Sequence, residues 1–229
     1  MEEPILKVKN LNVKLDGEEI IKDLSFEVKE GEVLTILGPN GAGKTVLLKT
    51  LLGILPYEGE IDWRKEVKIG YVPQRLPFIK DMPMSVKEFF DLENVSENEM
   101  KEVLKSIGTG QEILKKKIGE LSSGQFQRTL IGWALASNPQ ILLFDEPLAG
   151  VDVGGQESVY NLLEKLKKEK NLTILFVTHE LSIVYKFSDR VLCLNKRMLC
   201  CGVPKEILIP ERISELYSGE IKFYQHRHK

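Results

Sequence analysis

The stretch from residue 33 to residue 54 places the tightest constraint on the fold. It reads VLTIL, then GPNGAGKT, then VLLKTLLGI: a short apolar run, a glycine-rich loop and a helix-like apolar segment. Gly38, Gly41 and Gly43 let the backbone pass close to an anion, because a side chain would block the approach or forbid the required φ values. Backbone N–H groups at a helix start present partial positive charge to phosphate. The pattern GxxxxGK[ST] in this context predicts a phosphate-binding loop at Gly38–Thr45.

The side chains of this loop fit a magnesium–nucleotide ligand. Lys44 is expected to reach the β- and γ-phosphates, and the Thr45 hydroxyl to ligate Mg²⁺. The remaining candidate nucleotide contacts are in the loop and at the helix start: Pro39, Asn40, Ala42 and Val46.

Acidic residues follow a second apolar run, ILLFDEP, at residues 141–147. This run should carry Asp145 to the carboxyl edge of a sheet, where α/β proteins bind ligands, and a carboxylate there can hold Mg²⁺. Glu146 comes next and could orient and deprotonate an attacking water. His179 ends another apolar run, TILFVTH. A lone histidine is more often structural, but a parallel strand would deliver this one beside Asp145, within reach of the γ-phosphate or the water.

The pattern of apolar residues predicts an α/β fold. VLTIL, ILLFD, TILFVTH and RVLCLN are continuous apolar runs, typical of parallel strands buried on both faces. The first thirty residues instead alternate between apolar and polar around LDGEE, which predicts an antiparallel β element. We predict one domain over residues 1–229: a P-loop NTPase (RecA-like) core with a parallel sheet, an N-terminal antiparallel β subdomain and a helical subdomain inserted at about residues 75–135.

The composition excludes other classes of protein. The 229 residues have a formal net charge of −2, so we expect no nucleic-acid partner, which would need a basic face. The most apolar run is broken by Lys49 and is shorter than the ~20 residues of a membrane span. The start, MEEP, lacks the features of a signal peptide. Cys193, Cys200 and Cys201 are therefore expected to be buried thiols of a reduced, cytoplasmic protein.

Further motifs place the chain in a family. YVPQ, LSSGQ, LLFDEP, LAGVD and His179 occur in the order and spacing of an ATP-binding cassette ATPase, which the chain resembles over essentially its whole length. LSSGQ is the most specific element, because P-loop proteins in general lack it. Its residue Ser122 is a natural N-cap for the following helix. The resemblance implies that Ser122, Ser123, Gly124 and Gln125 bind the γ-phosphate held by the loop of a second copy, so that two ATP molecules are sandwiched in a head-to-tail dimer.

The resemblance also assigns roles to single residues. Gln74 would contact Mg²⁺ or the attacking water, and Asp152 would cross the dimer interface near the opposite site. Glu146, His179, Gln74 and Lys44 would form the catalytic set. The chain departs from the family pattern at three positions: Ser123 replaces the usual first glycine of the signature, Leu15 replaces the aromatic residue that stacks on adenine, and Trp133 replaces an arginine.

Within the family, IGYVPQRLPF, GVDVGGQESVYNLL and RVLCLNKRMLCCG resemble the zinc/manganese uptake subfamily. This likeness implies an ATPase on the inner face of the cell membrane. It would work beneath an integral membrane permease supplied by an extracytoplasmic substrate-binding protein, importing zinc, manganese or iron. An importer of a non-metal substrate and a soluble ATPase of iron–sulfur cluster assembly remain alternatives, whereas a P-loop kinase or GTPase would leave LSSGQ unexplained. His226 and His228 could bind a metal, but a short basic terminus is usually disordered.

Overall fold

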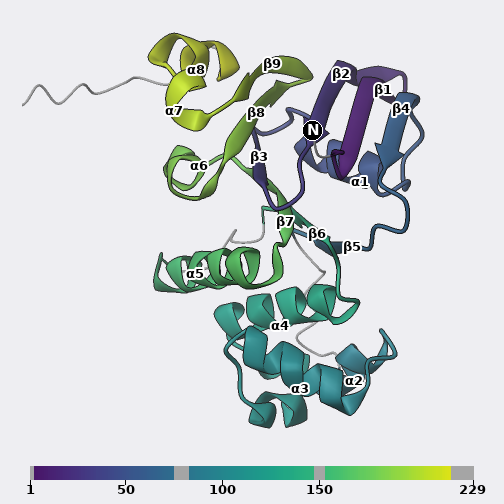
Figure 1. Ribbon diagram of the computed structural model, residues 1–229, viewed down its shortest axis with the longest axis vertical. Coiled ribbons are helices and arrows are strands. Elements are labelled where there is room, and N and C mark those ends of the chain that lie inside the picture. The colour runs from purple at the N-terminus through teal and green to yellow at the C-terminus, as the bar shows by residue number, and fades with distance from the viewer. Residues whose placement is uncertain (1–2, 75–82, 147–152, 218–229) are drawn as a thin grey trace, which may run out of the picture. The chain divides into compact units, whose positions relative to one another are not determined.

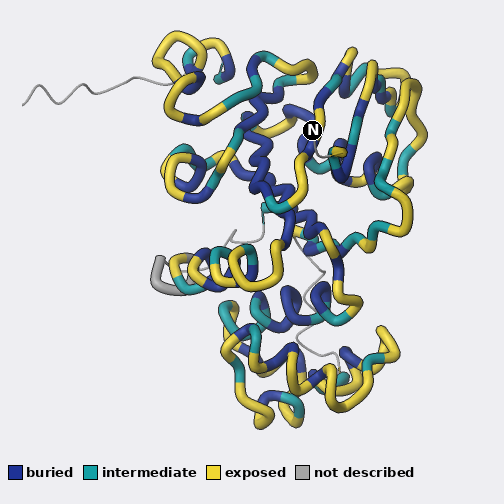
Figure 2. The backbone as a smooth tube through the Cα atoms, viewed as in Figure 1, coloured by how far each residue is buried: buried dark blue, intermediate teal, exposed yellow. Residues whose placement is uncertain are grey.

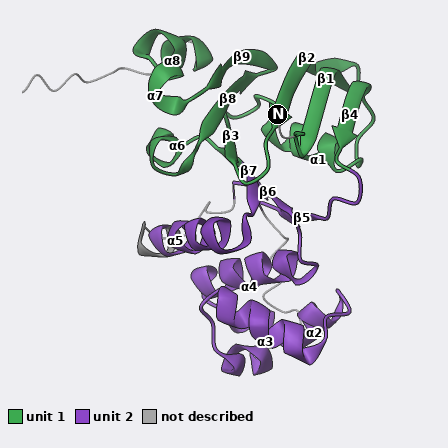
Figure 3. Cartoon of the chain, viewed as in Figure 1, with its two compact units in different colours: residues 1–64, 176–229 green, residues 65–175 purple. Residues whose placement is uncertain are grey.

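The computed structural model describes residues 3–74, 83–146 and 153–217 of the chain (Figure 1). Three residues with predicted roles, Asp152, His226 and His228, lie outside these ranges. The chain forms two compact units, Met1–Arg64 with Phe176–Lys229 and Lys65–Leu175 (Figure 3).

Unit 1 begins with the predicted antiparallel element. β1 (Leu6–Leu15) and β2 (Glu18–Val28) pair in antiparallel fashion, and β4 (Glu58–Trp63) pairs with the other edge of β1. The hairpin turns at Asp16 and Gly17, whose φ angles are 51° and 84°. Positive φ at both central residues matches the right-handed twist of the flanking strands. The DG pair within the alternating pattern therefore specifies this hairpin, and that prediction is confirmed.

The rest of unit 1 contains a parallel pair of strands. β3 (Val33–Leu37), buried at every position, runs parallel to β8 (Arg190–Asn195), as the continuous apolar runs predicted (Figure 2). β9 (Arg197–Gly202) returns antiparallel to β8. The helices of this unit are α1 (Lys44–Leu51), α6 (Leu181–Phe187), α7 (Pro204–Ile207) and α8 (Pro210–Leu216).

Unit 2 contains the other parallel pair. β5 (Ile69–Val72) runs parallel to β6 (Ile141–Asp145), and every residue of β6 is buried. β7 (Thr173–Thr178) starts in this unit and ends in unit 1. The helices of unit 2 are α2 (Val86–Asp91), α3 (Glu97–Ser106), α4 (Ser123–Ala136) and α5 (Val153–Lys170), with short 3₁₀ turns η1 (Gln111–Lys115) and η2 (Ile118–Glu120). Parallel strands connected through helices, with an antiparallel sheet at the N-terminus, confirm the predicted α/β class.

Close packing of α4 against its neighbours requires a small residue at Gly132. A Cβ atom added there would lie 2.9 Å from the Ile107 Cδ1 atom and 3.1 Å from the Phe90 Cζ atom. Contacts this short would force the Ile107 and Phe90 side chains to shift if a larger residue replaced the glycine. No helix within the described ranges combines the length and the apolar character that a membrane crossing requires.

The cysteines differ from the prediction. Cys193 and Cys200 are buried, as expected, but they form a disulfide rather than free thiols. The strand register explains the pairing, because the two residues lie directly opposite each other on β8 and β9 with Cα atoms 5.0 Å apart. Cys201 keeps its thiol.

Candidate functional site

The phosphate loop occupies the connection between β3 and α1 in unit 1. Gly43 is the N-cap of α1 with a φ of 96°, a left-handed conformation that glycine adopts at no steric cost. At Gly38 the reason for glycine is space: an added Cβ atom would overlap the backbone oxygen of Leu194 in β8. The two glycines thus fit the loop for different reasons, one conformational and one steric.

Lys44 supplies the positive charge of the loop. Its side chain is buried, and its Nζ atom donates to the backbone oxygens of Gly38 at 2.9 Å and Pro39 at 3.0 Å. The ammonium therefore lies against the loop beside the N-terminus of α1, so a buried cation and a helix start favour the same anion. Thr45 follows in the first turn of α1, where its hydroxyl can serve as an oxygen ligand.

The turn between β8 and β9 contacts the phosphate loop, and the sequence did not predict this contact. The Lys196 N–H donates to the Ala42 oxygen at 3.0 Å, and the Lys196 oxygen accepts from the Lys22 N–H at 2.8 Å. These two bonds link the loop to β2 through the turn. Ile20 in β2 also borders the loop, because its oxygen lies 3.1 Å from a Cβ atom built on Gly43. Leu15 is half-buried at the end of β1.

The predicted acidic pair lies at the carboxyl end of β6 in unit 2. Asp145 is almost fully buried. Glu146 follows with a φ of 45°, a left-handed conformation that is uncommon for a residue with a side chain and is often found at functional sites. The Gln74 Nε2 atom donates to the Glu146 Oε2 atom at 3.1 Å. The structure thus brings together the candidate base and the candidate glutamine of YVPQ.

Tyr71, a residue that the sequence reasoning missed, contacts the other carboxylate. The Tyr71 hydroxyl lies next to the Asp145 carboxylate. Burial raises the pKa of Tyr71 to about 12, and the neighbouring Asp145 carboxylate acts in the same direction. The hydroxyl therefore keeps its proton at neutral pH and is available as a donor to that carboxylate. The motif IGYVPQ contained this tyrosine, but only the pairing of β5 with β6 shows what it touches.

LSSGQ opens helix α4, and its Ser122 is the N-cap, as predicted. The Ser122 hydroxyl accepts from the Gln125 N–H, and the Gln125 Oε1 atom accepts from the Ser122 N–H, both at 3.2 Å. This reciprocal pair is a capping box, which satisfies two backbone donors at the helix start. A Cβ atom added to Gly124 would touch nothing within 4 Å, so packing in the described part of this copy does not explain the glycine.

His179 directly follows β7 and is exposed. Its backbone oxygen accepts a hydrogen bond from the Tyr217 hydroxyl at 3.0 Å. The histidine belongs to unit 1, together with the phosphate loop, whereas Asp145 and Glu146 belong to unit 2. Its predicted place beside Asp145 stays a prediction.

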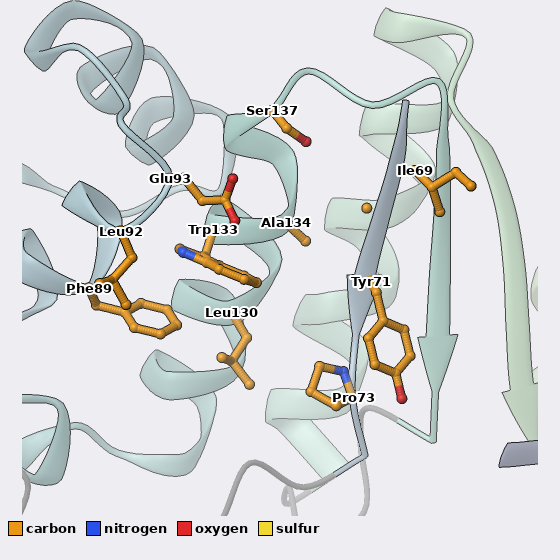
Figure 4. Close-up of a pocket in the computed structure, with 11 residues that line it drawn as sticks. Ile69, Tyr71, Pro73, Phe89, Leu92, Glu93, Leu130, Trp133, Ala134 and Ser137 are labelled. Atoms are coloured by element: carbon orange, nitrogen blue, oxygen red, sulfur yellow. The ribbon is translucent and has the colours of Figure 1, made fainter. Parts of the chain in front are cut away.

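A cavity of about 660 Å³ opens between β5 and helices α2 and α4 of unit 2 (Figure 4). Its wall is mostly apolar: Tyr71 and Pro73 lie on one side, and Phe89, Leu92 and Trp133 on the other. The rings of Phe89 and Trp133 lie 5.3 Å apart. Trp133, one of the departures from the family pattern, thus packs on an aromatic neighbour, and its buried indole N–H has no acceptor within the described residues.

The side chains available to a metal at these positions are hard oxygen donors. Asp145, Thr45 and Gln74 offer a carboxylate, a hydroxyl and an amide, the donor types that suit Mg²⁺. No group of three or more His, Cys, Asp or Glu side chains is placed to hold a metal in the described portion of the chain. By its donor chemistry, each of these side chains suits a magnesium ion bound together with phosphate and water.

Comparison with known proteins gives a consistent result. The family model described as ABC transporter matches residues 21–149. The zinc import ATP-binding protein ZnuC of Rickettsia prowazekii is 38% identical over 231 residues, which cover 100% of this chain and 98% of that protein. A metal transport system ATP-binding protein of Thermotoga maritima is 41% identical, covering 93% of this chain and 90% of that protein. A solved chain of a metal-chelate type ABC transporter in an inward-facing conformation is 28% identical with a TM-score of 0.83, covering 93% of this chain and 89% of its own.

Proposed function

Because the chain belongs to the ABC transporter family, we propose that it is the ATP-hydrolysing subunit of a membrane importer for a divalent metal ion. The metal assignment depends on similarity to zinc and metal transport ATP-binding proteins. The similarity covers nearly the full length of this chain and of each relative. The proposed cargo is then zinc, manganese or iron.

ATP binding follows from the family, and the phosphate loop supports the proposed contacts. The backbone of Gly38–Thr45, with Val46 behind it, cradles the phosphates, and Lys44 pairs with the terminal ones. Leu15 provides an apolar surface for adenine. Thr45, Asp145 and Gln74 would hold Mg²⁺, which when bound neutralises charge on the phosphates. In this proposal Glu146 accepts a proton from the attacking water, and His179 contacts the γ-phosphate.

Gln74 has a second role in the proposal. Its amide donates to Glu146, so it fixes the carboxylate whose direction decides which water loses a proton. Gln74 is also the last described residue before the segment that leads to α2. We therefore assign to Gln74 the relay between nucleotide state and the helical subdomain at about residues 75–135.

The proposed active form is a head-to-tail dimer of this chain, with two ATP molecules between the copies. LSSGQ supports this assignment because its backbone N–H groups lie at a helix start and Gly124 leaves open space beside them. In each copy Ser122, Ser123, Gly124 and Gln125 face the γ-phosphate held by the other copy, with Asp152 nearby.

The cavity of unit 2 is the proposed receptor for a cytoplasmic helix of the permease. An amphipathic helix fits an apolar groove of this kind, and Leu92, which is 60% exposed at its edge, offers a further apolar contact. The subunit would then lie on the inner face of the cell membrane and depend indirectly on an extracytoplasmic binding protein.

The partner assignment is tested by affinity purification from solubilised membranes of the source organism. Tagged Glu146→Gln protein with ATP and Mg²⁺ should retain a multi-span permease, and a Leu92→Glu, Trp133→Ala variant with normal ATP binding should lose it. Recovery of soluble iron–sulfur assembly proteins in place of a permease would overturn the transport assignment and leave the ATPase chemistry standing.

A further inference from the structure

One side chain, Tyr71, belongs both to the wall of the cavity and to the surroundings of Asp145. β5 and β6 pair in parallel with Tyr71 opposite Leu143. Because side chains alternate between the faces of a strand, Asp145, two residues after Leu143, projects on the same face as Tyr71. Figure 4 shows the Tyr71 hydroxyl directed toward the carboxyl ends of the two strands. The hydroxyl thereby lies close enough to the Asp145 carboxylate to interact with it.

Packing of the Tyr71 ring restricts where its hydroxyl can lie. A tyrosine has only two side-chain torsions, and the ring of Tyr71 lies half-buried in the cavity wall beside Pro73. Asp145 is 1% exposed, so its carboxylate depends on hydrogen-bond donors from the protein for solvation. A donor fixed by a packed ring restricts rotation of that carboxylate.

We propose that Tyr71 is a positioning residue for the metal, whose hydroxyl holds the Asp145 carboxylate in the orientation that binds Mg²⁺. The inference rests on the proposed function, in which Asp145 contributes to the magnesium site. Partners of a metal-binding carboxylate fix its direction, and their removal typically costs between 10- and 100-fold in metal affinity or activity. Tyr71 touches neither the nucleotide nor the water in this account and acts only through Asp145.

Tyr71→Phe tests the proposal, because it removes the hydroxyl and leaves the ring in the cavity wall. Binding of Mn²⁺, a spectroscopic substitute for Mg²⁺, is measured by electron paramagnetic resonance with the non-hydrolysable ATP analogue AMP-PNP. Binding of AMP-PNP alone is measured in EDTA. We expect Tyr71→Phe to weaken Mn²⁺ binding by about tenfold and to leave AMP-PNP binding in EDTA and the melting temperature unchanged.

Tyr185→Phe is the matched control. The Tyr185 hydroxyl donates a hydrogen bond to the Leu208 oxygen at 2.9 Å. Tyr185 belongs to α6 and is distant in sequence from Asp145 and Glu146. This variant should bind Mn²⁺ and AMP-PNP like the wild type.

Two results would overturn the inference. Wild-type Mn²⁺ affinity in Tyr71→Phe would show that the hydroxyl does not position the carboxylate. An equal loss of Mn²⁺ and AMP-PNP binding with a lower melting temperature would show a merely structural role. The proposed function fails separately, and the inference with it, if the wild-type protein binds AMP-PNP no more tightly with Mg²⁺ than in EDTA.

Discussion

At the scale of single residues, the chemistry assigned to the site depends on the direction of a few side chains. Glu146 is the clearest case. Its left-handed backbone places it in an uncommon conformation, and its carboxylate is held by the Gln74 amide. A general base needs this kind of fixed geometry, because proton transfer requires the water to lie within hydrogen-bond reach of the carboxylate.

Glu146→Gln should therefore abolish turnover without abolishing binding. We expect phosphate release to fall by about 10²-fold or more, because the amide cannot accept the proton. ATP binding should persist, and the ATP-bound dimer should accumulate on a gel-filtration column. Turnover equal to that of the wild type would show that Glu146 is not the general base.

The adenine surface can be tested at Leu15. Leu15→Tyr should tighten ATP binding by about 1 kcal/mol, since an aromatic ring stacks on the base better than an aliphatic side chain. Calorimetric titration with ATP measures the gain, and inorganic tripolyphosphate, which lacks the base, should bind equally to both proteins. Unchanged ATP affinity would mean that adenine is held elsewhere.

The thiol of Cys201 gives a pH-dependent prediction. Burial raises the pKa of Cys201 above its ordinary value of 9.0, although the Arg190 guanidinium acts in the opposite direction. Only the thiolate reacts with iodoacetamide, so alkylation should be slow at neutral pH and should still increase above pH 9. Mass spectrometry of the unreduced protein follows the reaction, and Cys201→Ser should abolish the label. A rate that stops rising below pH 9 would contradict the raised pKa.

At the scale of elements, the local motifs were predictable and the contacts between strands were not. The β1–β2 hairpin, the phosphate loop and the N-cap at Ser122 each depend on residues close together in the chain, so their patterns were sufficient. The Tyr71–Asp145 contact and the Cys193–Cys200 disulfide depend on strand pairing, which a single sequence does not reveal. The resemblance to the cassette ATPase family is confirmed, because its motifs are specific as a set.

The capping box of α4 allows structure and function to be separated. Ser96 at the start of α3 forms the same reciprocal pair with Glu99 as Ser122 forms with Gln125. Ser122→Ala and Ser96→Ala should each lower the free energy of unfolding by about 1 kcal/mol, measured by denaturant titration. Only Ser122→Ala should also weaken the ATP-dependent dimer and its turnover. Equal effects of both variants on the dimer would show that Ser122 only caps its helix and has no role in dimer formation.

At the scale of the whole molecule, three surfaces take part in the proposed transport cycle. In the proposed cycle, the phosphate loop and the carboxylates of Asp145 and Glu146 act on ATP, LSSGQ acts on the ATP of the second copy, and the cavity of unit 2 receives the permease. Transport, unlike ATP hydrolysis, requires all three together, so it is the property that tests the account as a whole.

The most direct test is metal uptake by cells of the source organism whose own gene for this chain is replaced. Cells carrying the wild-type chain, the Glu146→Gln chain or no chain are given radioactive zinc, manganese or iron at low concentration. We expect uptake of at least one of these metals to require the wild-type chain and to be lost in both other strains. Equal uptake of all three metals by the three strains would contradict the assignment to metal import.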